Sequence, residues 1–263
     1  MSSSVPVEAP PFSDWNELAE LDPLWTILSD PQKKFGKWDP AEFFGTGERE
    51  ADRVMAMCKS HGLALRFGTF LDFGCGVGRM TRGFSRFFAS CVGLDVSKKM
   101  VGLAEQFNAS VPNCQFVASE AVRLPFESNR FDFVFSTLVL QHLPTRRMIL
   151  SYIAEFIRVA KEGGAIVFQL PMNVPLRRRL QLRRRAWATL ASVGVPSSWM
   201  FKKAGLAPIL INGISRKEVE RFIRAQGAQL RAAQVFESNP EAFHSYYYFA
   251  IKEGSAASGD AVK

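Results

Sequence analysis

Three glycines and one aspartate have the residue types and spacing of a nucleotide-binding site. Gly74, Gly76 and Gly78 follow a short apolar run and precede a helical pattern, and Asp95 stands twenty-one residues beyond Gly74, at the end of the next apolar run. Glycine lets the backbone turn tightly and approach a ligand, and the free N–H groups of a helix N-terminus attract it. A carboxylate at the second position accepts hydrogen bonds from the two hydroxyls of a ribose. These residues therefore predict a site for a nucleoside-containing ligand.

The spacing also separates two classes of such ligands. Dinucleotide sites use G-x-G-x-x-G, whereas this chain has G-x-G-x-G, with Asp72 two residues before the first glycine. Both differences argue against a dinucleotide. A nicotinamide-dependent oxidoreductase remains the alternative enzyme class.

The elements that must position these residues alternate along the chain. Apolar runs predict strands, and helical patterns separate the first five of them. This alternation predicts right-handed crossovers and a mostly parallel sheet, and two last runs with no helix between them predict an antiparallel hairpin. The predicted strands lie at 69–73, 91–95, 115–117, 131–135, 165–170, 229–236 and 245–251; the predicted helices lie at 48–61, 79–88, 97–108, 145–161 and 215–226.

The block Leu71-Asp-Phe-Gly-Cys-Gly-Val-Gly78 resembles motif I of the class I S-adenosylmethionine-dependent methyltransferases, of the type 11/12-like kind. Four further blocks resemble later motifs of the family in the same order, so the resemblance covers roughly residues 69–170. It implies an α/β, Rossmann-like fold with a seven-stranded, mostly parallel sheet in the order 3-2-1-4-5-7-6, the last strand antiparallel and helices on both faces. The four later blocks are Gly93–Ser97, Ser119–Phe126, Phe131–Ser136 and Ala160–Gly164.

The resemblance also implies the cofactor, S-adenosyl-L-methionine, and the residues that bind it. Asp72 and the glycine backbone would hold the methionine part and Asp95 the ribose. Val96 would pack on the adenine, and Glu120 would stand near its amino group, where the family usually has Asp. The full implied set is Asp72, Gly74, Cys75, Gly76, Gly78, Asp95, Val96, Glu120, Ala121 and Ser136.

Methyl transfer is an in-line displacement that needs alignment, exclusion of water and removal of a proton from a hydroxyl-like acceptor. His142, shortly after the fourth predicted strand, is the candidate general base; the alternative is that it caps or packs the next helix. Trp38, Phe44 and Gln141 are the candidates for lining the substrate pocket, since aromatic faces suit a sulfonium cation.

No metal site is predicted. Some quinone-pathway methyltransferases place two Glu and one His after the fourth strand, but here Leu138 and Gln141 stand at the Glu positions. One remaining ligand, His142, does not make a metal site.

The net charge of +8 comes from one segment. Pro171 to Lys203 holds six Arg and two Lys without any Asp or Glu, while the other 25 basic and 25 acidic residues cancel. A helix there would place Leu176, Leu180, Trp187, Leu190 and Ala191 on one face. Three interpretations stay open: a lid helix, a clamp for an anionic substrate, or a peripheral contact of Arg177–Arg185 with acidic lipid or nucleic acid. The sequence shows no RNA-binding appendage that would support a contact with nucleic acid.

The domain organisation follows from composition. Residues 1–14 and 254–263 are predicted to be disordered tails, 15–47 an aromatic-rich leader with little regular structure, and 48–253 the methyltransferase domain with a basic insertion at 171–210. The chain shows no signal peptide and no apolar run of membrane-spanning length. Its four cysteines form no C-x-x-C pair, which favours free thiols and the cytoplasm.

The predicted function is methyl transfer to a small-molecule, saccharide or lipid-linked acceptor. Two alternatives stay open: an NAD(P)-dependent oxidoreductase, and a non-catalytic module of the same fold that binds anionic lipid or RNA.

Overall fold

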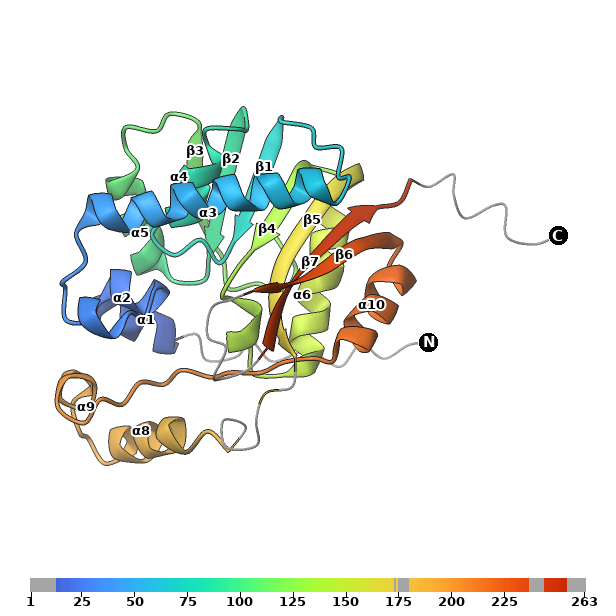
Figure 1. Ribbon diagram of the computed structural model, residues 1–263. Helices are drawn as coiled ribbons and strands as arrows, with labels where there is room; N and C mark the ends of the chain where they lie inside the picture. Colours follow the sequence, from blue (N-terminus) through green and yellow to red (C-terminus); the bar gives the residue numbers. More distant parts are fainter. Residues whose placement is uncertain (1–12, 173, 175–179, 237–243, 255–263) are drawn as a thin grey trace.

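A seven-stranded sheet forms the centre of the computed structural model, which describes residues 13–172, 174, 180–236 and 244–254 (Figure 1). The strand order is β3-β2-β1-β4-β5-β7-β6, as predicted. Strands β1 to β5 run parallel, and β7 is antiparallel to both β5 and β6. The strands are β1 (Thr69–Phe73), β2 (Ser90–Asp95), β3 (Cys114–Ala118), β4 (Phe131–Ser136), β5 (Ala160–Met172), β6 (Ala228–Phe236) and β7 (His244–Lys252).

Helices cover both faces of this sheet. On one face, α3 (Pro40–Ser60) and α4 (Arg79–Phe84) pack on Phe70, Phe133 and Phe135. On the other face, α6 (Arg146–Val159) and α10 (Arg216–Ala225) pack on the residues of opposite parity, such as Leu71 and Val134. Alternate residues of a strand point to opposite faces, so strands buried on both sides are continuously apolar. The predicted crossover topology is confirmed.

The helix boundaries have local causes. Ser97 accepts a hydrogen bond from Met100 N and begins α5 (Lys98–Phe107), as predicted. Thr145 does the same for α6 through Met148 N. Gly227, with φ of +77°, follows α10 in the left-handed conformation that glycine favours. The fifth strand begins earlier than predicted, at Ala160. Its pairing with β4 is irregular, because Ala160 lies opposite Phe131 whereas Ala165 lies opposite Phe133, and the strand therefore includes Gly163 and Gly164.

The leader is helical, so the prediction of little regular structure was wrong. It contains α1 (Ser13–Leu21), α2 (Pro23–Ile27), a 3-10 turn (Pro31–Lys33) and the first turns of α3, which runs across residues 47 and 48. Each of the last three begins with Asp followed by Pro, where the carboxylate caps free N–H groups and Pro takes the first helical position. The three dipeptides are Asp22-Pro23, Asp30-Pro31 and Asp39-Pro40.

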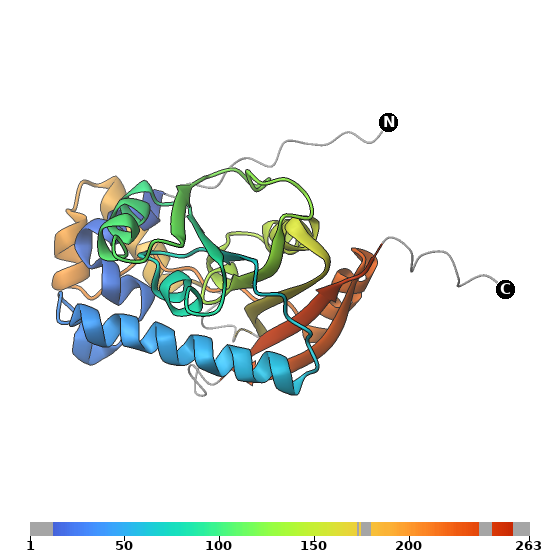
Figure 2. The ribbon, with the colours of Figure 1, turned by 90° about the horizontal axis from the view of Figure 1, so that it is seen from above.

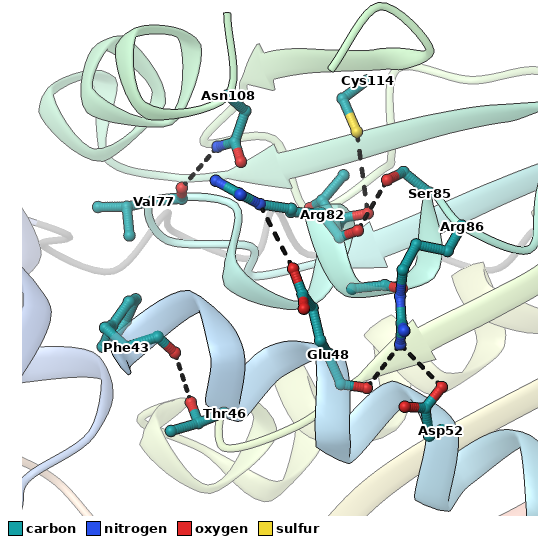
Figure 3. Close-up of polar contacts among 12 residues, drawn as sticks. Phe43, Thr46, Glu48, Asp52, Val77, Arg82, Ser85, Arg86, Asn108 and Cys114 are labelled. Atoms are coloured by element: carbon teal, nitrogen blue, oxygen red, sulfur yellow. Dashed lines mark hydrogen bonds and ion pairs between the residues drawn. The ribbon is translucent and has the colours of Figure 1, made fainter. Parts of the chain in front are cut away.

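Helix α3 packs closely on α4, the helix that follows the glycine turn (Figure 3). Arg86 donates to Asp52 Oδ1 and to the carbonyl of Glu48, at 2.8 Å each. Glu48 also pairs with Arg82, with 3.7 Å between Oε1 and Nε. The helices come so close at Gly47 that a Cβ there would collide with the Arg79 carbonyl. Helix α3 therefore fixes the position of α4.

The basic insertion forms two helices, α8 (Leu182–Ser192) and α9 (Ser197–Lys202). In both ribbon views they lie beside α1 and α2, away from β6 (Figures 1 and 2). Trp187, Met200 and Phe201 form a small core there with Trp25 of the leader. The predicted apolar face of this segment forms only in part. Trp187 is buried, but α8 begins at Leu182, and Leu180, which precedes the helix, is 43% exposed. Leu176 and Arg177–Arg179 lie outside the described residues. No helix in the described part of the chain is long and apolar enough to cross a bilayer.

Candidate active site

A cavity of about 830 Å³ opens at the carboxyl ends of β1, β2 and β4. Parallel sheets of this kind bind ligands in the crevice beyond those ends. The sheet contributes Phe73, Asp95 and the loop at Thr137–Leu143, while the leader and the insertion contribute a second group of residues. The volume lies in the usual range of small-molecule sites. Residues from across the sequence therefore converge on one pocket.

The glycine turn borders this cavity with a backbone that only glycine adopts easily. Gly74, Gly76 and Gly78 have φ angles of +75°, +53° and +82°. A Cβ at Gly74 would collide with Val139, and one at Gly76 would lie 2.5 Å from Cδ1 of Ile27. A ligand can therefore approach the backbone of this turn closely. Of the three, Gly74 and Gly76 line the cavity, whereas Gly78 faces Asn108 and Phe116 and begins α4.

The Asp95 side chain is buried at the edge of the cavity. One oxygen accepts a hydrogen bond from Gly76 N at 2.8 Å and the other from Ser97 N at 2.9 Å. Burial raises the pKa of this carboxyl, and the backbone hydrogen bonds from Ser97 and Gly76 oppose that rise. The N–H groups hold the carboxylate in place, and each oxygen keeps a lone pair for a ligand hydroxyl. Val96, beside it, also lines the cavity.

Asp72 and Arg79 are both buried on the cavity wall, and each lies within electrostatic reach of the other. Thr81 Oγ1 donates to Asp72 Oδ2 at 2.7 Å, yet burial still raises the pKa of Asp72 to about 7. Arg79 is 5% exposed; it donates to Thr46 Oγ1 at 3.2 Å, and its Nε has no hydrogen-bond partner among the described residues. Burial lowers the pKa of Arg79. Buried polar atoms are rarely unsatisfied, so this wall suits a ligand that carries charges of both signs.

His142 lies on the cavity wall, at the end of a 3-10 turn (Leu140–His142). Its Nδ1 donates to the carbonyl of Leu210 at 2.6 Å, which leaves the lone pair on Nε2. Gln141 Nε2 lies 3.1 Å from that nitrogen and donates to it. The ring of Trp15 packs edge-on, with centroids 5.1 Å apart. Burial lowers the pKa of His142 to about 4, so the imidazole is neutral near pH 7. Gln141 also lines the cavity.

Aromatic and aliphatic side chains form much of the remaining lining. Trp38 lines the cavity, but Phe44 does not: it is buried under Arg82 and packs against Phe43 and Phe107. Trp15 and Trp25 of the aromatic-rich leader, which no local motif marks as pocket residues, also reach the cavity. The leader contributes Trp15, Trp25, Ile27, Leu28 and Trp38; the insertion contributes Arg183, Gly205, Ala207, Ile209 and Ile211.

Four other residues implied by the resemblance have different surroundings. Glu120 and Ala121 are exposed and do not line the cavity, although the preceding Ser119 does. Ser136 is buried, and its hydroxyl donates to the Phe73 carbonyl at 3.0 Å. Cys75 lines the cavity, but burial raises the pKa of its thiol well above the ordinary value, so it is not a thiolate nucleophile.

The described residues contain no group of three or more His, Cys, Asp or Glu that would hold a metal ion. All four cysteines are free thiols.

Comparison with known proteins gives a methyltransferase match over the part of the chain that builds the glycine turn and the first five strands. Residues 71–168 match the family model described as a methyltransferase domain. Demethylmenaquinone methyltransferase of Staphylococcus epidermidis is 37% identical over 100 residues, which is 37% of this chain and 40% of that protein. Tocopherol O-methyltransferase of Arabidopsis thaliana is 32% identical over 162 residues, 56% of this chain and 46% of that protein. The chain thus spans less than half the length of these relatives.

Solved structures agree with the fold. Magnesium protoporphyrin IX methyltransferase of Synechocystis, solved with bound SAH, matches with a TM-score of 0.59 at 16% identity, over 92% of this chain and 97% of that one. An S-adenosylmethionine-dependent methyltransferase of Clostridium acetobutylicum matches with a TM-score of 0.58 at 13% identity, over 91% and 99% of the two chains. Residues 71–168 match a methyltransferase domain, and the chain shares the fold of these solved methyltransferases.

Proposed function

We propose that this protein transfers a methyl group from S-adenosylmethionine to a small-molecule acceptor. The observation that carries the proposal is the Asp95 carboxylate, fixed by Gly76 N and Ser97 N at the wall of an 830 Å³ cavity, within a chain segment that matches a methyltransferase domain. Relatives named for demethylmenaquinone, tocopherol and magnesium protoporphyrin methylation support a small-molecule acceptor.

The residues on the cavity wall fit this cofactor. Asp95 would bind the ribose hydroxyls and Val96 would pack on the adenine. Asp72 would attract the ammonium group of the amino-acid part. Arg79, whose buried Nε has no hydrogen-bond partner among the described residues, would attract its carboxylate. The cofactor, when bound, supplies an electrophilic methyl group on a sulfonium. Glu120, Ala121 and Ser136 remain proposed contacts by resemblance alone.

The chain's own contribution to the reaction is alignment, exclusion of water and acceptance of a proton. Helices α1 and α2 and the segment that follows α9 carry apolar residues to the cavity, and these side chains exclude water from it. His142 would accept the acceptor's proton at Nε2 once the acceptor replaces Gln141 as the donor to that nitrogen, because Nδ1 is held by Leu210. A pKa of about 4 keeps the His142 imidazole neutral near pH 7 and makes it a weak base.

Among the acceptor classes considered, small molecules, saccharides and lipid-linked compounds, the lining favours an acceptor with an apolar or aromatic body. Trp15, Trp25 and Trp38 supply flat apolar surface, and Ile209 and Ile211 add aliphatic contact.

A labelling experiment tests the proposal. The protein is incubated with cofactor labelled in its methyl group and with a small-molecule extract, and the labelled products are separated. We expect label in one or a few apolar products, and a strong decrease with Asp95→Ala. Label that reaches no small molecule would overturn the proposal.

A further inference from the structure

The outer face of the basic insertion combines exposed apolar and basic side chains. Leu182, Ala186, Thr189 and Val193 are spaced four, three and four residues apart along α8, so they share one side of the helix. All four are exposed, Leu182 by 61% and Val193 by 72%. Trp187 faces the opposite way, into the small core with Met200 and Phe201. The stripe is therefore not the face by which α8 packs on the protein.

Helix α9 and Lys203, the residue after it, also expose both apolar and basic side chains. Trp199 is 51% exposed, and Lys202 and Lys203 are exposed beside it. On α8, Arg185 is exposed next to the apolar stripe. No acidic residue occurs between Glu162 and Glu218, so no carboxylate of the insertion balances these charges. An isolated exposed apolar residue is ordinary, but two short basic helices that expose leucine, valine and tryptophan side chains have the residue types of interfacial segments.

We propose that the outer face of α8 and α9 docks on an anionic lipid surface. Long basic side chains attract acidic headgroups, and the leucine, valine and tryptophan side chains enter the boundary between headgroups and acyl chains. Charge complementarity selects this partner over a neutral surface, and the apolar side chains select it over a nucleic acid, which would need only the charges. Both ribbon views place these helices at the edge of the molecule, where a flat surface can reach them (Figures 1 and 2).

The same segment lines the cavity, which gives the docking a role. Arg183, Gly205 and Ala207 border the cavity while Leu182 and Arg185 face outward. Docking would place the cavity beside the lipid surface, so an apolar acceptor could pass between them with little exposure to water. The docking itself does not depend on methyl transfer.

Vesicle sedimentation of the full chain tests the proposal. We expect binding to vesicles of phosphatidylglycerol and phosphatidylcholine in equal parts, and none to phosphatidylcholine alone. Two variants alter the face without touching cavity residues: Arg185→Gln/Lys202→Gln/Lys203→Gln, and Leu182→Ser/Trp199→Ser. Each should lower the partition coefficient by about tenfold to a hundredfold, and added salt should weaken wild-type binding.

Matched controls use equally exposed residues elsewhere. Lys217→Gln/Arg221→Gln/Arg231→Gln removes three charges from α10 and β6, and Phe67→Ser/Val235→Ser removes one aromatic and one aliphatic side chain that are 52% and 50% exposed. Both controls should bind like the wild type. Binding of S-adenosylhomocysteine by every variant, measured separately, reports on folding and on the proposed function independently of docking.

A second measurement does not depend on any variant with lost binding. Brominated acyl chains should quench tryptophan fluorescence of the bound wild type, and Trp199→Phe should bind but show less quenching. Three results would each overturn the proposal: no wild-type binding to the anionic vesicles, equal losses in the control variants, or unchanged binding of Leu182→Ser/Trp199→Ser. The last result, with displacement by single-stranded nucleic acid, would identify a general polyanion contact instead.

Discussion

Individual side chains set the charge pattern of the cavity. Asp72 and Asp95 are buried carboxyls whose pKa values are raised by burial. Arg79 is a buried guanidinium with one nitrogen that has no partner in the described part of the chain. Groups of this kind cluster at functional sites, because their desolvation is unfavourable unless a ligand makes use of it.

The first residue-scale prediction concerns Asp95. Asp95→Ala removes the acceptors for the ribose hydroxyls, and hydrogen bonds to charged groups contribute about 1.5–3 kcal/mol. We expect the affinity for S-adenosylhomocysteine to fall roughly tenfold to a hundredfold, measured by calorimetry, with the thermal unfolding transition retained. Wild-type affinity in Asp95→Ala would contradict the assigned position of the ribose.

The second concerns Asp72 and pH. Its pKa is about 7 without ligand, so below that value the site is increasingly protonated and neutral. A ligand ammonium group prefers the carboxylate, so binding releases the proton. The affinity for S-adenosylhomocysteine should therefore be constant above pH 7 and fall by up to about tenfold per pH unit below it. Asp72→Asn should bind weakly and without this pH dependence. A flat wild-type profile across neutral pH would show that Asp72 does not hold the ammonium group.

The third concerns His142. If Nε2 accepts the proton, His142→Ala should lower kcat by about 10²–10⁴ with cofactor affinity little changed. His142→Asn keeps a donor for the Leu210 carbonyl but has no basic nitrogen, so it should be equally impaired. If Asn restores activity, His142 is a structural residue that holds the loop. His61→Ala serves as the control, because His61 does not line the cavity and instead lies beside Gln234 of β6.

At the scale of elements, the contact between α3 and α4 holds the glycine turn in place. The helices approach through Gly47 and Gly83, since a Cβ on Gly83 would lie 2.6 Å from the Gly47 carbonyl oxygen. Salt bridges from Arg82 and Arg86 to α3 fix their register (Figure 3). On the other side of the turn, Asn108 donates to the Val77 carbonyl at 3.0 Å.

A matched pair of glycine substitutions tests this contact. Gly47→Ala should lower the free energy of unfolding by about 1–3 kcal/mol, because the added methyl group forces the two helices apart. Gly102→Ala, inside α5 and with open space at its Cβ, should instead raise it by about 0.5–1 kcal/mol. Denaturant unfolding measures both. Equal effects would mean that the α3–α4 approach is not tight.

The two kinds of element differ in how well the sequence predicts them. Strands such as Phe131–Ser136 are short apolar runs between helices, so their identity and order follow from pattern and from the resemblance. The leader was misjudged because its helices are short and their signal lies in the Asp-Pro dipeptides rather than in apolar periodicity. Leu180 matches the helical spacing of Trp187, but α8 begins only at Leu182, after Gln181, whose backbone is left-handed.

At the scale of the whole molecule, the cavity wall is only partly predictable. The cavity positions of Asp72, Gly76 and Asp95 can be predicted from local motifs. All three belong to one βαβ unit, in which the strand ends and the glycine turn lie close together. Trp15 and Ile209 reach the same cavity from segments far apart in sequence, and no local pattern says which side chain of an aromatic-rich leader faces inward. Phe44 illustrates the difference: it has the expected residue type, but α3 turns it toward Phe107.

Titration of the wild-type protein with S-adenosylhomocysteine and, separately, with NADH and NADPH tests the central claim most directly. The glycine spacing, Asp95 and the Asp72–Arg79 pair predict micromolar binding of S-adenosylhomocysteine and no binding of either dinucleotide. Binding of a dinucleotide without binding of S-adenosylhomocysteine would contradict the account and identify the site as that of an oxidoreductase.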